Sequence, residues 1–420
     1  MSLRFRRDVP ILLVYVSIFF VSCSRPSLPP IPFLGRQPNE TPAVQVAETP
    51  LPLPSATPLA VPAARSLFES TGNPYIPNFG SFPPIPIPAR PANINPLTGL
   101  AVEPALLQRR PLLVRIGNDT RVRENYWQVG TASADLVFEE LIDQIGDQYI
   151  NTRLTAVFLS KDAPLVGPVR SGRLINLQLV PMLDGAVAHA GASDGVRWIF
   201  SHTPVHDLDE YFNQPAYCYI NPHGYIGRLY TTVPRLREWL VQKGLEQGVP
   251  LYGFAFSETA PGGASAHSIG INAAPWPKSA VVEWRYDSDH RHYVRYVSGD
   301  PLIDNSYSVK ANWGNGADCV KASGESRVQV TAANVVVLYA RHEATDIVED
   351  ANNAVSVYIN LTGQGDADIF RDGVRLRGSW QRDSVQEFFR LTTSTGETIS
   401  LKPGNTWFEV VPIGFDLDVK

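Results

Sequence analysis

The segment GPVRSGR at residues 167–173 brings two arginines and a serine together where the pattern changes from strand-like to helix-like. A serine at the start of a helix can cap its first turn, and the free backbone N–H groups there favour negatively charged groups. If Ser171 is such a cap, the guanidinium groups of Arg170 and Arg173 add donors shaped for oxyanions. We therefore expect this junction to bind an anion. The alternative is that Arg170 forms internal ion pairs, since buried arginines are nearly always paired. Its candidate partners are Asp135, Glu139 and Glu140.

The same stretch resembles a Walker A loop only in part. Arg173 stands where that loop has its lysine, and Leu174 stands where it has the hydroxyl that binds Mg²⁺. Without the metal ligand we expect no nucleotide hydrolysis, and the sequence predicts no cofactor.

A possible catalytic serine follows in HAGASDG at residues 189–195, where G-x-S-x-G comes after a strand-like run, as in a nucleophile elbow. Ser193, then Asp207 or Asp209, then His223 would follow the chain order of the α/β hydrolases. The favoured alternative is a polar turn that caps the next helix. The sequence therefore predicts no catalytic residue, with Ser193 and His223 kept as the hydrolase alternative.

Two further groups of side chains have the right types for chemistry but no secured geometry. His202, His206, Asp207 and Asp209 could hold a metal ion, but Pro204 argues against one helix that carries both histidines. We expect a surface loop there and no metal site. A second group could supply two carboxylates for glycan hydrolysis, but a solvated acidic face is favoured. Its members are Glu139, Glu140, Asp143 and Asp147.

The elements that would position these residues alternate between strands and helices up to about residue 250. Strands are expected at 110–118, 153–160 and 185–192, with helices at 172–184 and 233–248. The run ADLVFEELI fits either a helix or a strand. Later runs alternate apolar and polar residues, as hairpins do. The sequence predicts a layered α/β N-terminal domain followed by a mostly β C-terminal domain, α+β overall.

The first residues are typical of an export signal. Arg4, Arg6 and Arg7 precede an apolar run of eleven residues, shorter than the ~20 that a spanning helix needs. The run ends in FVSC, which resembles a lipobox, so residues 1–23 are expected to be a lipoprotein signal peptide with lipidation at Cys23. An ordinary secretory signal is the alternative.

Residues 24–92 hold half of the 36 prolines and few charges, so they cannot build a core. We expect a disordered linker there, an N-terminal domain at 93–250 and a C-terminal domain at 251–420. Lipidation of Cys23 leaves Cys218 and Cys319, which form either one disulfide or two free thiols. The net charge of −5 argues against nucleic-acid binding.

A series of motifs in one order then carries a family resemblance. The motifs are NPLTGL, SADLVFEELI, TRLTAVF, GPVRSGR, AHAGAS, LYTT, ANVVVLY, FRDGVRLRGSW and LKPGNTWFEVVP. Together they resemble the YerB-like family, which holds the N- and C-terminal domains of unknown function 3048. The resemblance implies an exported protein, in a family with many described lipoproteins, and no settled activity. Two departures favour binding over catalysis: Ile226, Gly227 and Arg228 replace Pro-His-Asn before LYT, and Leu302 replaces a common His.

We therefore expect a binding protein anchored through Cys23 to the outer face of the cell membrane. Its ligand would be an anionic cell-envelope molecule or an envelope protein, held at the ends of neighbouring strands. The expected pocket residues are Arg170, Ser171, Arg173, His189, Ser193, Glu139, Asn118 and Arg153. The alternatives are a hydrolase of a wall glycan, peptide or ester, and a purely structural envelope lipoprotein.

Overall fold

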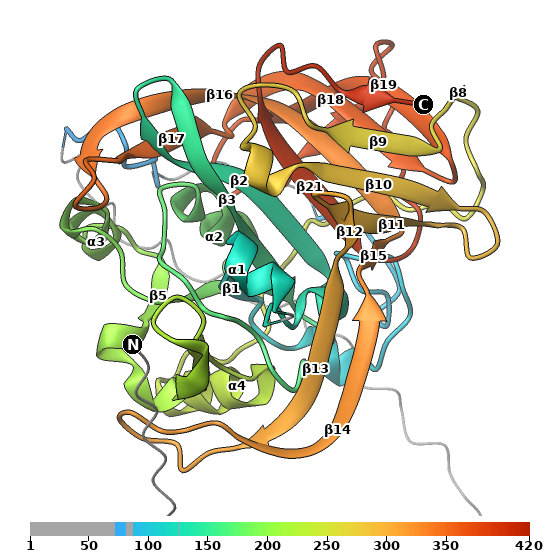
Figure 1. Ribbon diagram of the computed structural model, residues 1–420. Helices are drawn as coiled ribbons and strands as arrows, with labels where there is room; N and C mark the ends of the chain where they lie inside the picture. Colours follow the sequence, from blue (N-terminus) through green and yellow to red (C-terminus); the bar gives the residue numbers. More distant parts are fainter. Residues whose placement is uncertain (1–71, 81–86, 126) are drawn as a thin grey trace, which may run out of the picture. The chain divides into compact units, whose positions relative to one another are not determined.

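The computed structural model describes residues 72–80, 87–125 and 127–420 (Figure 1). These residues belong to one compact unit, Pro62–Lys420. The expected signal peptide, Cys23 and most of the expected linker lie outside the described residues. Among the helices that the structure describes, none is both long and apolar enough to cross a membrane.

One mixed sheet of twelve strands runs through this unit and takes strands from both halves of the sequence (Figure 1). The central strand is β21, which pairs in parallel with β2 on one side and with β16 on the other. A strand near the C-terminus therefore joins the two expected domains within one sheet. The twelve strands are β1 (Leu112–Gly117), β2 (Leu136–Ile145), β3 (Gln148–Phe158), β4 (Ala186–His189), β5 (His206–Asp209), β8 (Ala264–Ser265), β16 (Asn334–Val348), β17 (Val355–Asn360), β18 (Gly363–Arg371), β19 (Val374–Arg382), β20 (Arg390–Thr392) and β21 (Thr406–Pro412).

An apolar cluster covers each face of this sheet. Successive side chains of a strand point to opposite faces, so one strand contributes to both clusters. Along β1, Leu112 and Val114 belong to one apolar cluster and Leu113 to the other. The first cluster includes helix α4 (Val233–Gln242) and a second sheet, and the other includes helices α2 (Asn176–Leu183) and α3 (Asp194–Ser201). The second sheet consists of β9 (Ser268–Ile271), β10 (Val282–Asp287), β11 (His292–Val297), β12 (Asp300–Pro301), β15 (Thr331–Ala332) and β22 (Asp418–Val419).

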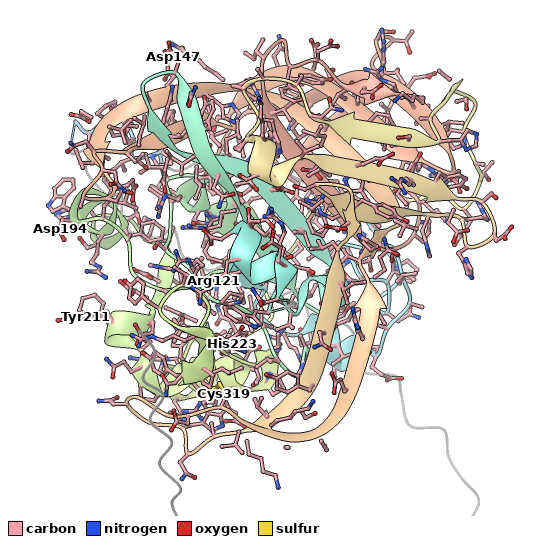
Figure 2. The ribbon with its side chains drawn as sticks, in the orientation of Figure 1. Arg121, Asp147, Asp194, Tyr211, His223 and Cys319 are labelled. Atoms are coloured by element: carbon pink, nitrogen blue, oxygen red, sulfur yellow. A yellow bond between two sulfur atoms is a disulfide. The ribbon has the colours of Figure 1, made fainter. Side chains whose placement is uncertain are left out.

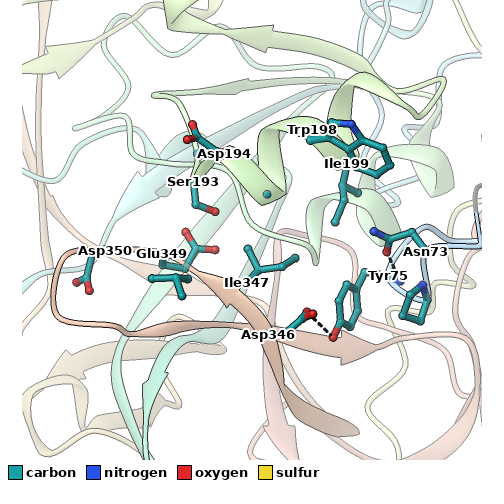
Figure 3. A pocket seen from close by; sticks show the side chains of 14 residues that line it. Asn73, Tyr75, Ser193, Asp194, Trp198, Ile199, Asp346, Ile347, Glu349 and Asp350 are labelled. Atoms are coloured by element: carbon teal, nitrogen blue, oxygen red, sulfur yellow. Dashed lines mark hydrogen bonds between the residues drawn. The ribbon is translucent and has the colours of Figure 1, made fainter.

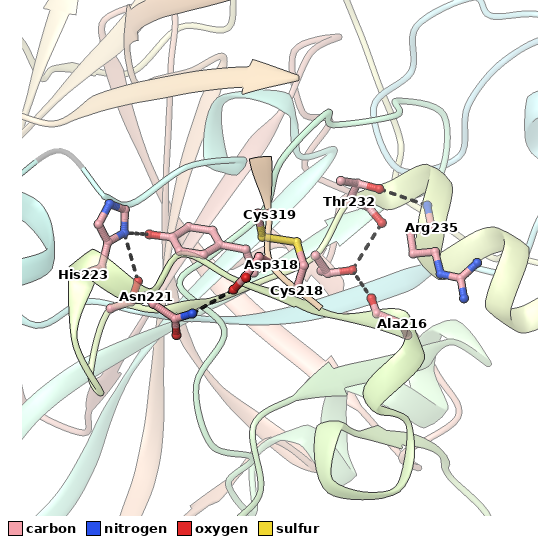
Figure 4. The surroundings of a disulfide bond; sticks show 11 residues. Ala216, Cys218, Asn221, His223, Thr232, Arg235, Asp318 and Cys319 are labelled. Carbon is pink, nitrogen blue, oxygen red and sulfur yellow. Dashed lines mark hydrogen bonds between the residues drawn. A yellow bond between two sulfur atoms is a disulfide. The ribbon is translucent and has the colours of Figure 1, made fainter. Parts of the chain in front are cut away.

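A long two-stranded arm is built by β13 (Ile303–Lys310) and β14 (Val320–Gln329) (Figure 1). A disulfide between Cys218 and Cys319 ties the start of β14 to the small hairpin of β6 (Cys218–Tyr219) and β7 (Leu229–Tyr230) (Figure 4). Of the two possibilities for these cysteines, the structure has the bridge.

A fully buried ionic cluster lies between the two sheets. The Arg295 guanidinium of β11 pairs with Glu139 of β2 and, at 2.7 Å, with Glu409 of β21. It also lies over the rings of Trp284 and Trp407. Burial raises the pKa of Glu409 to about 8. Because Arg295 of the C-terminal half pairs with Glu139 of the N-terminal half, the cluster connects the two halves in addition to the shared sheet.

The fold is more β-rich than the sequence predicts. Strands dominate the described residues, with only α1 (Thr120–Glu124), α2, α3 and α4 as α-helices there. The layered α/β expectation is therefore confirmed only in part. ADLVFEELI becomes β2, whose apolar residues serve both faces and therefore show no alternation. α4 begins as expected, with the Thr232 hydroxyl accepting a 3.0 Å hydrogen bond from the Arg235 N–H.

Candidate functional site

The GPVRSGR segment does not start a helix. Val169 forms a β-bridge with Ile116 of β1, the Arg170 N–H donates to the Arg115 carbonyl, and the Gly172 N–H donates to the Gly191 carbonyl. Helix α2 begins only at Asn176 and has no side-chain cap. The expected cap by Ser171 is therefore wrong. Backbone N–H groups of this segment take part in pairing with neighbouring chain segments and are not gathered at a helix start.

Arg173 is enclosed by acidic groups. Its guanidinium donates twice to the Asp143 carboxylate, with both N···O distances 2.7 Å, and lies 3.5 Å from Glu349. Its side chain is only 8% exposed. Arg170 is more open, with 20% of its side chain exposed and a looser 3.8 Å contact to Asp119. Arg173 therefore forms internal ion pairs. The alternative interpretation expected such pairing for Arg170, but with other carboxylates than Asp143 and Glu349.

The remaining expected pocket residues divide between the two faces of the sheet. Glu139 and Glu140 are consecutive in β2, so their side chains point in opposite directions. Glu139 faces the second sheet and accepts a 2.9 Å hydrogen bond from Asn118. Arg153 is paired in register with Glu140 and therefore shares the other face. One pocket cannot contain all of the expected residues.

On the Arg153 face, burial is the main influence on ionisation. It lowers the pKa of Arg153 to about 9, with Arg173 and Arg170 acting in the same direction. It raises the pKa of Glu140 to about 7, although Arg115 lies 2.5 Å from that carboxylate and opposes the rise. The Arg153 guanidinium donates to the Ser171 carbonyl at 3.2 Å. The expected positive site is thus a buried layer in which arginines and carboxylates alternate.

The structure does not assemble the hydrolase alternative. In the described part of the chain no histidine is hydrogen-bonded to Ser193. His189 is buried, with its ring nitrogens on Asp207 at 2.7 Å and on the Gly191 carbonyl at 2.9 Å. His223 stacks on Trp127 and contacts the Tyr230 hydroxyl. Figure 2 shows His223 well apart from Asp194, the neighbour of Ser193.

The histidine and aspartate group at 202–209 is likewise divided among separate partners. Asp207 holds His189, Asp209 accepts from Arg197 at 2.9 Å, and His202 stacks on Trp198. The side chains of this group stabilise the turn before α3 and the end of that helix.

Ser193 does line a pocket, at the start of α3 (Figure 3). The pocket has a volume of about 690 Å³ and is bounded by three segments that are distant in sequence: residues 73–75, 192–199 and 346–350. The last segment covers the end of β16 and the turn after it. Gly195 permits this arrangement, because a Cβ there would lie 2.7 Å from the Ile347 side chain.

The pocket is acidic and partly aromatic. Its fourteen lining residues include four carboxylates and no lysine or arginine. The carboxylates belong to Asp194, Asp346, Glu349 and Asp350. The rings are Trp198, 46% exposed, and Tyr75, whose hydroxyl donates to Asp346 at 3.2 Å. Such a pocket suits a positively charged group, which carboxylates attract and aromatic faces stabilise further.

Glu349 connects this pocket to the buried layer below it. Burial raises the pKa of its carboxyl, while Arg173 opposes the rise and Asp143 adds to it. Ser193 also lowers this pKa, which is consistent with the hydroxyl facing Glu349 in Figure 3. Arg173 of the GPVRSGR segment, which was expected to bind an anion, thus positions the acidic side chain of Glu349 in the pocket.

Sequence reasoning found Ser193 but missed the other walls. The signal for one wall was DIVED at 346–350, three acids in five residues, which covers the end of β16 and the turn after it. The contribution of Tyr75 could not be seen, because it lies in the stretch whose composition predicts a linker.

The fold is that of a mostly β protein whose two sequence halves share one sheet, with a pocket between α3 and β16. Comparison with known proteins identifies its family. Residues 97–246 match the N-terminal domain of "Protein of unknown function (DUF3048)", and residues 272–408 match the C-terminal domain. The chain belongs to this YerB-like family, as the motifs predict.

YerB of Bacillus subtilis is similar to this chain both in sequence and in structure. "Putative lipoprotein YerB" of strain 168 is 25% identical over 339 residues, which cover 77% of this chain and 86% of that protein. The crystal structure of YerB protein has a TM-score of 0.59 at 21% identity, covering 78% of this chain and 99% of that one. The structural likeness concerns the fold.

Proposed function

We propose that this chain is an exported lipoprotein, anchored at Cys23, which binds a positively charged group of an envelope peptide or protein in the acidic pocket at the start of α3. The anchor is supported by the N-terminal sequence and by the relative described as a lipoprotein. A linker at residues 24–92 would carry the folded unit away from the membrane surface.

The pocket lining is the observation that carries the binding proposal. Four carboxylates, two aromatic rings and no basic side chain favour a cation over the anionic ligand that the sequence predicts. Arg173, one of the two arginines expected to bind an anion, is already paired with Asp143 and Glu349. An amino or guanidinium group of a peptide fits this lining.

Calorimetric titration tests the proposal. The probe is a short peptide with one free lysine amine, compared with the same peptide acetylated on that amine. We expect the free amine to bind more tightly, and Asp346→Asn or Trp198→Ala to weaken its binding about fivefold or more. Asp366→Asn, an exposed acid of β18 outside the pocket, is the matched control. Equal binding of both peptides would rule out recognition of the charge.

A second candidate is glycoside hydrolysis, favoured by the raised pKa of Glu349 in a pocket with other carboxylates. A general acid with a raised pKa beside an ionised carboxylate is the usual arrangement for that chemistry. Release of reducing sugar from wall glycan, lost in Glu349→Gln, would support it. No release by the unmodified protein would exclude it for that substrate.

A further inference from the structure

The turn between β10 and β11 gathers three side chains of the kind that bind transition metals. It has the sequence DSDHRH, residues 287–292. Asp287 ends β10, His292 begins β11, and the two are direct partners in the antiparallel ladder. Cross-strand partners project to the same face of a sheet, so the ladder fixes these two side chains next to each other. His290 joins them from the turn.

The three possible ligand atoms lie within 4.8 Å of one another. The His290 Nδ1 is 2.8 Å from Asp287 Oδ2, and the His292 Nε2 is 3.9 Å from the same oxygen. The two imidazole rings are nearly parallel, with centroids 5.6 Å apart. Small side-chain rotations would therefore bring one nitrogen of each ring and one carboxylate oxygen to a common ion.

We propose that Asp287, His290 and His292 form a binding site for a divalent transition-metal ion such as Zn²⁺. Two imidazoles and one carboxylate are a ligand set that suits zinc, with the remaining coordination position left to water. Mg²⁺ and Ca²⁺ prefer oxygen ligands and are poorly served here. The site is independent of the acidic pocket, because no residue lines both.

The surroundings leave the three ligands available. Arg291 lies between the two histidines in sequence, but its guanidinium pairs with Asp372 at 2.7 Å. Lys402 lies 3.6 Å from the same Asp372 carboxylate. Asp372 also binds Arg371 at 2.7 Å, so it draws these basic side chains toward itself, while the ionic contacts of Asp287 are with His290 and His292. His290 is 71% exposed in its side chain, so an ion reaches the site without any opening of the fold.

Calorimetric titration of the untagged full chain with ZnCl₂, and separately with MgCl₂, tests the site. We expect one Zn²⁺ per chain and no comparable binding of Mg²⁺. His290→Ala should weaken zinc binding about tenfold, and the double change of His290 and His292 to Ala should remove it. His202→Ala, a histidine outside the cluster, is the control and should bind as the unmodified chain does.

Thermal unfolding without metal shows whether the variants fold. We expect that they do, since the side chains of His290 and His292 are 71% and 30% exposed. Added Zn²⁺ should then raise the melting temperature of the unmodified chain and of the control, but not of the double variant. Equal zinc binding by the double variant, absence of zinc binding, or equally tight Mg²⁺ binding would each overturn the proposal.

Discussion

Arg173 Nη1 lies 3.5 Å from Glu349 Oε2, so a residue of the N-terminal half positions a pocket carboxylate of the C-terminal half. Both side chains are almost fully shielded from water, at 8% and 2% exposure. Arg173 also holds Asp143. One guanidinium therefore pairs with two carboxylates and holds the Glu349 side chain in place in the pocket wall.

Removal of Arg173 should destabilise the protein strongly. Arg173→Ala leaves Asp143 and Glu349 as unpaired carboxylates, which costs about 3–5 kcal/mol for a buried pair. Urea unfolding measures the change in the free energy of unfolding. Arg341→Ala is the control, since Arg341 is 69% exposed and its ion pair with Glu343 lies at the surface. Equal stability of the two variants would show that the buried pairing contributes nothing.

Glu409 should make stability depend on pH. Burial raises its folded-state pKa from 4.5 to about 8, so the folded protein holds this proton more tightly than the unfolded chain does. The stabilising effect is complete below about pH 4.5 and is lost as the pH rises through about 8.

The measurement is the difference in unfolding free energy between the unmodified chain and Glu409→Gln across that range. Because glutamine has no proton to lose, the variant should gain relative stability as the pH rises. A difference that stays constant with pH would contradict the assignment. Glu397→Gln, on an exposed turn, controls for loss of a negative charge.

The disulfide should stabilise the folded unit substantially. Cys218 and Cys319 are 101 residues apart in sequence, and closing a loop of that length in the unfolded chain contributes roughly 4–5 kcal/mol in the chain-entropy model. Replacement of both cysteines by serine should lower the urea midpoint, and dithiothreitol should act similarly on the unmodified chain but not on the variant. If the serine variant is as stable as the bridged protein, the disulfide next to the β13–β14 arm does not contribute to the free energy of unfolding.

Anchoring at Cys23 is a prediction from sequence alone. Cys23→Ser should abolish incorporation of labelled fatty acid and move the protein from the membrane fraction to the soluble exported fraction. Unchanged membrane association without the cysteine would count against the lipid anchor.

Several features of the fold could be predicted from the sequence because they rest on local signals. The start of α4 follows from the helical spacing of Leu236 and Leu240, although the helix ends at Gln242 and not at the expected residue 248. The strands expected at 110–118 and 153–160 follow from their apolar runs. β2 was ambiguous because both of its faces are buried, which removes the alternation that identifies a strand. Its parallel pairing with β21 joins residues 270 positions apart, and no local pattern encodes that contact.

The site was harder to predict, for a related reason. Glu139 and Glu140 are adjacent in the sequence but lie on opposite faces of the sheet, and only strand geometry separates them. The segment GPVRSGR contains the residue types of an anion site, but Asp143 and Glu349 neutralise Arg173 from elsewhere in the chain. The pocket wall at 346–350 lies against α3 because of the place of β16 in the shared sheet, which no local pattern encodes.

A crystal structure of the chain with the lysine peptide bound is the most direct test of cation binding in this pocket. We expect the peptide amine to lie within hydrogen-bond distance of the Asp346 or Glu349 carboxylate, beside Trp198. A peptide bound elsewhere, or one that places a carboxylate of its own in this pocket, would contradict it.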